Sequence, residues 1–380
     1  MSSSNEFDFI VVGAGMAGAS AAAQLCSRGR VAVLEAEAHA GVHATGRSAA
    51  LFSELYGNAA IRALTRASRA FLFSPPEGFA QVPLVTPRET FYFGRPDQAA
   101  ALAAFRASPD MASATRELSS AQAQAMLPVF RPDYLGGAVV DAGSADIDVD
   151  ALHQGFLRQA RAAGARLAFD SGASEIRAAG GRWQVQTRAG DTFSAPVLVN
   201  AAGAWGDEVA QRAGVARLGL EPKRRTALLI EVPDAHAAGA AAWPAAIDID
   251  EQFYFKPDAG LLLLSPADEH PSPPCDAQPE ELDIAIAVDR FETATGTQVR
   301  RVRRSWAGLR VFAPDRSPVV GFDAQAPGFF WLVGQGGYGI QTAPAMGRLA
   351  AALAAGEPLP EDLRAAGVST EPLARERLAR

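Results

Sequence analysis

The 380-residue sequence contains few of the residues that build disulfide frameworks, metal sites or basic surfaces. Its two cysteines, Cys26 and Cys275, form neither a CxxC pair nor a zinc-ligand pattern, so we expect no disulfide scaffold and no metal site. Of the 35 lysine and arginine residues, only Lys223 and Lys256 are lysines. The 42 acidic residues outnumber these basic residues and give the chain a net charge of −7. Because the arginines are also spread along the chain, we expect no nucleic-acid partner.

Long apolar runs are missing as well. No stretch reaches the ~18 apolar residues of a membrane helix, so we expect no transmembrane segment. The opening "MSSSNEFDFIVVGAG" lacks the basic region of a signal peptide, which favours a cytoplasmic location with peripheral membrane association left open. The hydrophobic content of 48% and charged content of 20% are typical of a folded chain, here long enough for two packed domains.

The first part of the chain predicts a βαβ unit. The segment "FDFIVV" (7–12) is short, apolar and β-branched, as in a buried parallel strand. "GAGMAGASAAAQLCSRG" then predicts a glycine-rich turn and a helix of small residues that stops at Gly29, and "RVAVLE" predicts the next strand.

Gly13, Gly15 and Gly18 form a GxGxxG pattern between that strand and that helix. In dinucleotide-binding folds the first glycine permits the tight turn, the second lets the pyrophosphate approach, and the third allows helix and strand to pack closely. The helix N-terminus adds amide donors for the phosphates. Glu35 ends the second strand at the offset where a carboxylate binds a ribose 2′-hydroxyl. These features together predict a dinucleotide site.

The rest of the chain alternates helical and strand-like segments. Helices are predicted at 98–106, 121–127, 151–163, 280–293 and 342–355, and strands at 172–200 and 225–265. Near the C-terminus, "FFWLVGQGGYGIQTAPAMGRLAAALAAG" predicts a strand, a glycine-rich loop and a helix. This segment offers a second helix N-terminus to a large cofactor.

Several motifs occur in the order found in one flavoprotein family: "VVGAGMAGAS", "GRSAA", "ADIDVDALHQGFLR", "VLVNAAGAW", "PKRR", "WAGLR" and "GQGGYGIQT". On these motifs the chain resembles the D-amino-acid oxidase-like (DAO) FAD-dependent oxidoreductases, most of all the bacterial D-arginine and D-amino-acid dehydrogenases. The resemblance implies an α/β (α+β) fold of the glutathione-reductase type. It implies a Rossmann-like FAD-binding domain from residues 1–80, 141–215 and 311–380, interleaved with a sheet-rich substrate domain from residues 81–140 and 216–310.

The resemblance also implies how FAD is held. His43 and Gly46 have the HxxG spacing of flavoproteins that attach FAD covalently, but the more similar relatives carry a histidine here and hold FAD non-covalently, which we expect for this chain. The implied cofactor-binding residues are Gly13, Ala14, Gly15, Met16, Ala17, Gly18, Glu35, Ala36, Gly46, Arg47, Ser48, Ala49, Ala50, Ala202, Gly203, Trp205, Gly308, Arg310, Gly336, Gly337, Tyr338, Gly339, Ile340 and Gln341.

An amino-acid substrate carries a carboxylate, which arginine recognises with two parallel hydrogen bonds. Arg225 and Arg310 match the family's carboxylate-binding positions; the alternatives are a surface basic cluster for Arg225 and a structural ion pair for Arg310. Tyr254 matches a further carboxylate contact, although an ordinary strand tyrosine remains open. The implied catalytic residues are Tyr56, Arg225, Tyr254, Arg310, Gly337 and Gln341, with the Gly337 carbonyl next to the substrate amine.

The pocket for the substrate side chain departs from the D-arginine dehydrogenases. Leu51 stands where they have a histidine, and Thr90 stands where they have the glutamate that binds the guanidinium group. A cationic side chain would lose its hydration there without gaining an anion, so a neutral or apolar substrate is predicted. A shift of one residue would instead turn Glu89 into the pocket. The implied pocket residues are Leu51, Ser53, Thr90, Ala245 and Ile247.

The activity implied by the resemblance is that of an FAD-dependent D-amino-acid dehydrogenase. The substrate would be oxidised to its imino acid by hydride transfer from Cα to flavin N5, and the imino acid would hydrolyse to a 2-oxo acid and ammonia. Neither lysine lies in a motif matching the flavin-side lysine of oxygen-using relatives, so a quinone or another acceptor is favoured over oxygen. The alternatives are a sarcosine-type secondary-amine oxidase, a 2-hydroxy-acid dehydrogenase and a non-catalytic flavoprotein subunit.

Overall fold

The predicted βαβ unit is present in the computed structural model, which describes residues 5–107 and 109–378. It consists of β1 (Phe9–Val12), α1 (Met16–Leu25) and β2 (Val31–Leu34), with β1 and β2 parallel. Helix α1 ends at Leu25, earlier than predicted, and a turn carries the chain on to Gly29.

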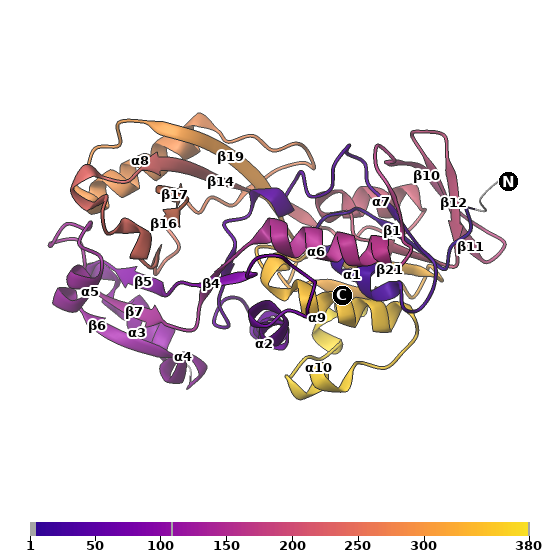
Figure 1. The fold of residues 1–380 in the computed structure, drawn as a ribbon, viewed down its shortest axis with the longest axis horizontal. Coiled ribbons are helices and arrows are strands. Elements are labelled where there is room, and N and C mark those ends of the chain that lie inside the picture. The colour runs from indigo at the N-terminus through magenta and orange to yellow at the C-terminus, as the bar shows by residue number, and fades with distance from the viewer. Residues whose placement is uncertain (1–4, 108, 379–380) are drawn as a thin grey trace.

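A six-stranded sheet lies at the centre of the lobe on the right of Figure 1. Its order is β20-β21-β13-β1-β2-β9, and the β20–β21 pair is antiparallel while the other pairs are parallel. The added strands are β9 (Arg166–Ala168), β13 (Val197–Asn200), β20 (Val319–Phe322) and β21 (Phe329–Val333). Strands β1, β2 and β21 are buried along their whole length, as expected when both faces of a parallel sheet are covered.

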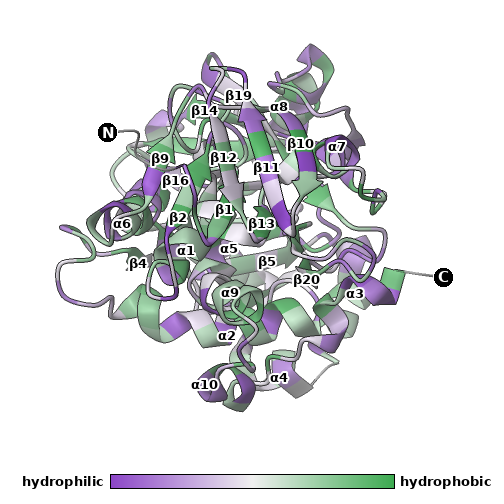
Figure 2. Cartoon of the chain, turned by 90° about the vertical axis from the view of Figure 1, so that its right-hand side faces the viewer, coloured by the Kyte–Doolittle hydropathy of each residue, from purple (hydrophilic) through white to green (hydrophobic). Residues whose placement is uncertain are grey.

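Two separate cores cover the two faces of this sheet. Phe9 and Val11 belong to the core that includes residues of α1, α2, α6 and α9, whereas Ile10 and Val12 belong to the core that includes β10–β12 and α7. Strand β11 alternates hydrophobic and hydrophilic residues in Figure 2 because only one of its faces is covered. The covering elements are α2 (Ala59–Phe73), α6 (Val149–Ala162), α7 (Gly206–Arg212), α9 (Gly339–Ala354), β10 (Ala173–Ala179), β11 (Arg182–Thr187) and β12 (Thr192–Ala195).

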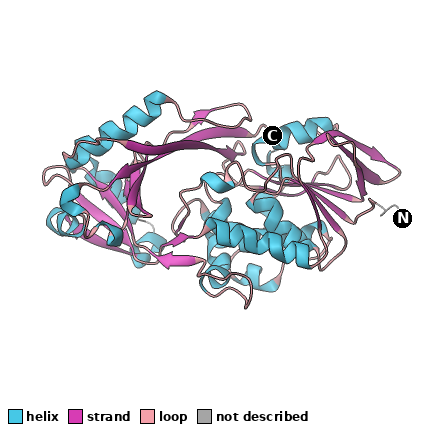
Figure 3. Ribbon diagram, turned by 45° about the horizontal axis from the view of Figure 1, so that its top comes forward, coloured by secondary structure: helices cyan, strands magenta, loops and turns pink. Residues whose placement is uncertain are grey.

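The second lobe is built on a nine-stranded sheet, with the order β18-β14-β17-β16-β15-β5-β7-β6 and with β19 paired to β14. Figure 3 shows its longest strands arching between the lobes. One face packs Phe91, Phe255 and Leu264 against α5 and α8. The strands are β5 (Thr90–Gly94), β6 (Thr115–Ser119), β7 (Gly137–Asp141), β14 (Glu221–Glu231), β15 (Ala245–Asp248), β16 (Tyr254–Asp258), β17 (Leu261–Ser265), β18 (His270–Pro271) and β19 (Val302–Phe312).

The remaining elements connect or flank these sheets. A small sheet of order β3-β8-β4 contains β3 (Leu51–Phe52), β4 (Val85–Pro87) and β8 (Ala145–Ile147). The other helices are α3 (Ala99–Arg106), α4 (Pro109–Ala114), α5 (Ser120–Met126), α8 (Glu281–Thr295) and α10 (Glu361–Ala365). The 3-10 helices are η1 (Thr45–Arg47), η2 (Pro96–Gln98), η3 (Gly203–Trp205), η4 (Asp234–His236), η5 (Ala240–Ala242), η6 (Glu371–Leu373) and η7 (Arg375–Leu378).

The strands of the two large sheets alternate along the chain. Strands of the six-stranded sheet lie within residues 9–34, 166–200 and 319–333, and strands of the nine-stranded sheet lie within residues 90–141 and 221–312. The mixed α/β fold is thereby confirmed, and the alternation supports the interleaved domains, whose exact limits stay a prediction. No helix within the described ranges has the length and apolar character needed to cross a bilayer.

Helices α1 and α9 pack closely because small residues line their contact. A Cβ atom on Gly347 of α9 would lie 2.7 Å from the carbonyl oxygen of Ser20 in α1. That separation is far shorter than van der Waals contact, and Ser20 is fully buried. Gly347 therefore sets the distance between the two helices that support the cofactor end of the molecule.

We predict that Gly347→Ala lowers the free energy of unfolding by ~1–3 kcal/mol, because the added methyl group forces α9 away from α1. Urea denaturation followed by circular dichroism measures the change. The matched control is Gly239→Ala, where a Cβ meets no atom within 4 Å and φ is −114°. Equal stabilities of the two variants would contradict the packing argument.

Candidate functional site

A cavity of about 360 Å³ lies between the carboxyl ends of β1 and β2 and the facing strands β14 and β19. Of the predicted cofactor residues, the cavity wall includes Gly13, Gly15, Met16, Ala17, Glu35, Ala36, Arg47, Ser48, Ala49, Ala202, Gly203, Trp205, Gly308, Arg310, Gly336, Gly337, Gly339 and Ile340. It also includes the predicted substrate residues Arg225 and Tyr254. The predicted residues outside the wall are Ala14, Gly18, Gly46, Ala50, Leu51, Ser53, Tyr56, Thr90, Ala245, Ile247, Tyr338 and Gln341.

The glycines after β1 have the roles that the spacing predicts. Gly13 has a φ of +101°, and a Cβ there would lie 2.6 Å from the carbonyl oxygen of Ala201. A Cβ on Gly18 would lie 1.9 Å from the Gly13 oxygen, so only glycine allows the helix to approach the turn. At Gly15 the nearest atom is Thr45 Oγ1, at 3.3 Å. The backbone of Gly15 is thus open to the cavity except for the threonine hydroxyl.

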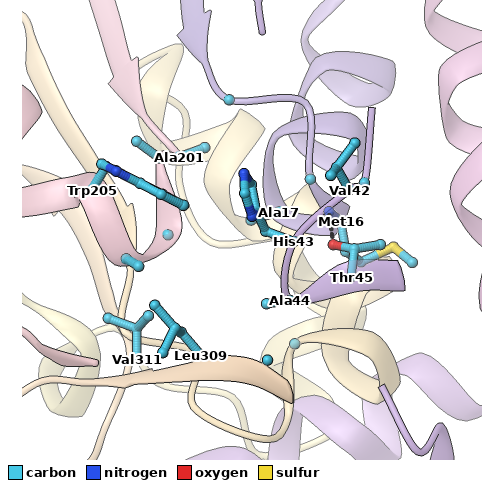
Figure 4. Close-up of a pocket in the computed structure, with 18 of the residues that line it drawn as sticks. Met16, Ala17, Val42, His43, Ala44, Thr45, Ala201, Trp205, Leu309 and Val311 are labelled. Atoms are coloured by element: carbon cyan, nitrogen blue, oxygen red, sulfur yellow. Dashed lines mark hydrogen bonds between the residues drawn. The ribbon is translucent and has the colours of Figure 1, made fainter. Parts of the chain in front are cut away.

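Side chains from three separate segments hold this turn in place. The Ala14 N–H donates to Glu35 Oε2 at 2.8 Å, and the Ala14 carbonyl oxygen accepts from His153 Nε2, also at 2.8 Å. The Met16 N–H donates to Thr45 Oγ1 at 2.9 Å (Figure 4). Burial lowers the pKa of His153, which is therefore neutral with its proton on Nε2, because a carbonyl oxygen only accepts. The turn is preorganised before any ligand binds.

His153 and Thr45 were not among the residues predicted for this site. Their sequence signals are weak, because His153 lies in an amphipathic helix and Thr45 in a small-residue segment. Only the fold brings them to residues 139 and 29 positions away. A short sequence motif cannot predict hydrogen bonds between residues so far apart in the chain.

His43 lies in the middle of the cavity wall, between Trp205 and Val42 (Figure 4). Its ring centroid is 4.6 Å from that of Trp205, and its Nε2 lies 2.9 Å from Glu37 Oε1. Its Nδ1 is buried without a hydrogen-bond partner among the described residues. One ring nitrogen therefore pairs with a carboxylate while the other remains available to a ligand.

Arg47 is predicted to place a charge beside the cofactor, but its guanidinium nitrogens bond mainly to other residues of the protein. It donates to the carbonyl oxygens of Val42, Ala277 and Ala307 at 3.1, 2.8 and 2.9 Å, and it pairs with Asp276. These bonds fasten η1 to strand β19. Arg47 therefore links the segment that contains η1 to strand β19 across the cavity.

Arg310 projects into the other end of the cavity without a carboxylate partner. Its Nη1 donates to Tyr56 Oη at 3.3 Å, and none of the ion pairs among the described residues includes it. Burial alone would lower the pKa of Arg310, but the Tyr56 and Tyr254 oxygens raise it, so the group is cationic. A Cβ on Gly337 would lie 2.9 Å from Arg310 Cζ, so the guanidinium rests against the bare backbone of the loop before α9.

Arg225 also lines the cavity, but it has partners. Its Nε donates to the Asp268 carbonyl oxygen at 2.8 Å, and its Nη2 lies 3.2 Å from Glu269 Oε1. Glu269 in turn binds Arg316, whose Nη2 is 3.0 Å from the same oxygen. Burial alone would raise the pKa of Glu269, but Arg316 and Arg225 hold it below its usual value.

Gln341 and Ser53 belong to a buried polar network behind the cavity. Gln341 accepts from the Ser53 N–H at 3.2 Å and donates to Thr65 Oγ1 at 2.9 Å, and the Ser53 hydroxyl donates to Asp141 at 2.8 Å. Burial raises the pKa of Asp141, and burial together with the Asp141 charge raises that of Tyr92. These residues support the wall rather than line it.

The other residues predicted for the side-chain pocket lie on adjacent strands. Thr90 pairs with Ala245, and Ile247 pairs with Tyr254, which puts all four on the sheet face that carries Tyr254 toward the cavity. Thr90 is fully buried, and its hydroxyl donates to Ser144 at 2.9 Å. Leu51 lies in β3, paired with Asp146. The Glu89 side chain binds Arg116 at 3.2 Å on the other side of the sheet.

Comparison with known proteins identifies similarity to FAD-dependent oxidoreductases. The sequence profile of a family described as FAD dependent oxidoreductase (DAO) matches residues 8–353. FAD-dependent oxidoreductase domain-containing protein 1 of Xenopus laevis is 28% identical over 180 residues, which is 41% of this chain and only 34% of that protein. The uncharacterized oxidoreductase YurR of Bacillus subtilis is 26% identical over 264 residues, 67% of each chain.

Solved structures share the fold at lower identity. Glycine oxidase from Geobacillus kaustophilus superimposes with a TM-score of 0.81 at 20% identity, covering 97% of this chain and 98% of its own. L-α-glycerophosphate oxidase from Mycoplasma pneumoniae, with FAD bound, gives 0.81 at 15% identity over 92% and 94%. Iminodiacetate oxidase from Chelativorans gives 0.76 at 22% identity over 96% and 98%.

We predict that His153→Phe weakens FAD binding by ~10-fold, since it leaves the buried Ala14 carbonyl oxygen without a donor and loosens the turn. Titration of apoprotein with FAD, followed by quenching of flavin fluorescence, gives the dissociation constant. His153→Gln keeps an amide donor and recovers part of the affinity, and His39→Phe, at an exposed position, has no effect. An unchanged FAD affinity in His153→Phe would show that the hydrogen bond plays no part in preorganisation.

Proposed function

The chain belongs to the FAD dependent oxidoreductase (DAO) family, and we propose that it is an FAD-dependent D-amino-acid dehydrogenase that oxidises a neutral or apolar amino acid to its imino acid. The observation that carries the proposal is the cationic Arg310 guanidinium, which faces the cavity, bonds to the Tyr56 hydroxyl and forms no ion pair with a carboxylate of the described residues. A partly buried cation without a paired acid favours the binding of an anion. The D configuration and the narrower likeness to D-arginine dehydrogenases rest on sequence resemblance.

The residues at the other end of the cavity fit FAD. The open backbone at Gly15 and the N-terminus of α1 suit a pyrophosphate, and Glu35 Oε1 and Oε2 lie at the end of β2 where a ribose is bound in this fold. The glycine-rich loop before α9, with Gly336 and Gly337 in the wall, leaves room for a flat ring. When bound, FAD accepts the two electrons and the hydrogen lost from the substrate Cα.

The protein's own contribution is to bind and orient the substrate. Arg310 and Tyr254 would bind the carboxylate, and the Gly337 carbonyl oxygen would accept from the amine. Holding both ends of the substrate fixes the direction of its Cα–H bond, which is how binding energy lowers the barrier when the cofactor performs the chemistry. No dedicated general base is required.

The side-chain pocket supports a neutral or apolar substrate. Thr90 bonds to Ser144 within the protein, and Glu89, the anion that a register shift would have supplied, binds Arg116 outside the pocket. Within the described residues, the acids of the cavity wall are Glu35, Glu37 and Glu208, all at the cofactor end. A basic side chain would lie beside Arg310 with no anion in contact.

An acceptor other than oxygen is favoured by the positions of the two lysines. Lys256 is buried and bonded to Asp146 at 2.6 Å, and Lys223 lies 3.1 Å from Glu221. Neither lysine lines the cavity. The lysine that accelerates oxygen reduction in oxygen-using relatives therefore has no counterpart among the described residues of the wall.

We expect neutral D-amino acids such as D-leucine or D-phenylalanine to bleach the flavin absorbance under anaerobic conditions. We also expect the reduced flavin to be reoxidised only slowly when air is admitted. The panel also includes D-arginine, the L-enantiomers of these amino acids, sarcosine and the 2-hydroxy acid lactate. An arginine binds the carboxylate of each of these compounds equally well. A strong preference for D-arginine would contradict the pocket argument. Bleaching by sarcosine or 2-lactate in preference to all amino acids would replace the proposed function.

Gly337→Ala should raise the substrate KM by ~10-fold, because the new methyl group overlaps the guanidinium of Arg310 and weakens a charge-assisted pair. FAD content and affinity are measured in parallel to separate an effect on the cofactor. In an Arg310→Met background the same substitution should add little, since both act through one interaction. Additive effects of the two changes would show that Gly337 acts independently of Arg310.

We propose that FAD is held non-covalently, because the relatives to which the sequence resemblance points carry a histidine at the position of His43 and hold FAD without a covalent bond. Precipitation of the holoprotein with trichloroacetic acid should leave the yellow flavin in the supernatant. A yellow pellet would demonstrate a covalent link, and the His43→Gln variant would then identify the attachment site.

A further inference from the structure

Arg225 and Arg310 reach the cavity from neighbouring strands. In the antiparallel pair of β14 and β19, Arg225 lies opposite Gly308 and Arg310 lies opposite Lys223. The two arginines are therefore diagonal neighbours on one face of the sheet, with the glycine leaving the space beside Arg225 open. Both line the same cavity.

The two cations differ in what balances their charge. Arg225 has the Glu269 carboxylate at 3.2 Å and retains free N–H groups, whereas Arg310 has no acid within ion-pair distance among the described residues. Glu251, on the exposed turn between β15 and β16, and Glu269 act on Arg310 only from a distance. Lys223, on the same strand face, is bonded to Glu221. One uncompensated cation therefore remains in the substrate end of the cavity.

Resting on the proposed function, we propose that Glu269 is a specificity-determining residue that restricts the site to substrates with a single carboxylate. The Arg310 charge binds that carboxylate, and Arg225, neutralised by Glu269, contributes hydrogen bonds without a net charge. A second carboxylate on the substrate would be buried beside an arginine that already has its anion, and close to the Glu269 charge itself. Dicarboxylic amino acids are thereby rejected by charge rather than by size.

Arg316 does not remove this effect. Its side chain is 46% exposed, so water screens its charge, and Arg316 does not line the cavity. When Arg316 is removed, Glu269 still forms its ion pair with Arg225. Removing the Glu269 charge, in contrast, leaves two uncompensated arginines facing the cavity.

The test compares the binding of two unreactive acids of the same length, propionate and malonate, to the oxidised holoenzyme at pH 8. The change in the flavin absorbance spectrum gives the dissociation constant of each acid. The wild-type protein should bind propionate at least ~10-fold more tightly than malonate, and Glu269→Gln should reduce or invert that ratio by a similar factor. Arg316→Gln is the matched control and should keep the wild-type ratio. The Glu269→Gln substitution preserves the shape of the side chain and one acceptor oxygen, but it removes the charge and the second acceptor.

An unchanged ratio in Glu269→Gln, or a wild-type protein that binds malonate as tightly as propionate, would overturn the inference. Equal relaxation in Arg316→Gln would do the same, because it would attribute the effect to the loop rather than to charge at Arg225. If Glu269→Gln cannot be prepared as holoenzyme, Glu269→Ala replaces it, and a wild-type protein that binds malonate as tightly as propionate still overturns the inference. These measurements need no turnover, so a protein that selects propionate but is not reduced by amino acids would refute the proposed function and leave this inference standing.

Discussion

The antiparallel pairing of β14 with β19 is the constraint on which the cavity depends. These two strands, eleven residues each, run from the substrate sheet to the cofactor lobe, and their register brings Arg225, Gly308 and Arg310 onto one face. A shift of one residue would turn every one of these side chains to the opposite face. Trp306 and Ala307 on β19 also bond to Arg47, so the same register fixes the turn that borders the cofactor end.

The glycine-rich turn after β1 follows from local sequence, whereas six of the predicted cofactor residues lie outside the cavity wall. Gly13 and Gly18 have the steric roles that GxGxxG implies, because those roles depend on atoms within one turn. Arg310 is predicted from its motif, and in the structure its guanidinium bonds to Tyr56 and forms no ion pair among the described residues. The α/β fold was likewise predictable, since strand and helix periods are local properties.

Other parts of the site could not be read from the sequence, because they depend on contacts between distant residues. The charge on Arg225 is balanced by Glu269, 44 positions away, and the Ala14 carbonyl is held by His153, 139 positions away. Gln341 and Ser53, predicted beside the substrate, join Asp141 in a network behind the wall. Motifs indicate which residues matter, but the partner of each polar group is set by the fold.

The interleaving of the two sheets has a consequence for how the protein is made. On the ribosome, β1 emerges early but gains its neighbour β13 only after about half of the chain, and β21 and α9 complete the lobe near the end. The loop closures involved are long, which slows assembly and leaves apolar strands exposed while they wait. Because the cavity draws on segments from Val12 to Ile340, it forms only after Ile340 has been synthesised. Cofactor binding therefore stabilises only molecules in which all of these segments have folded together.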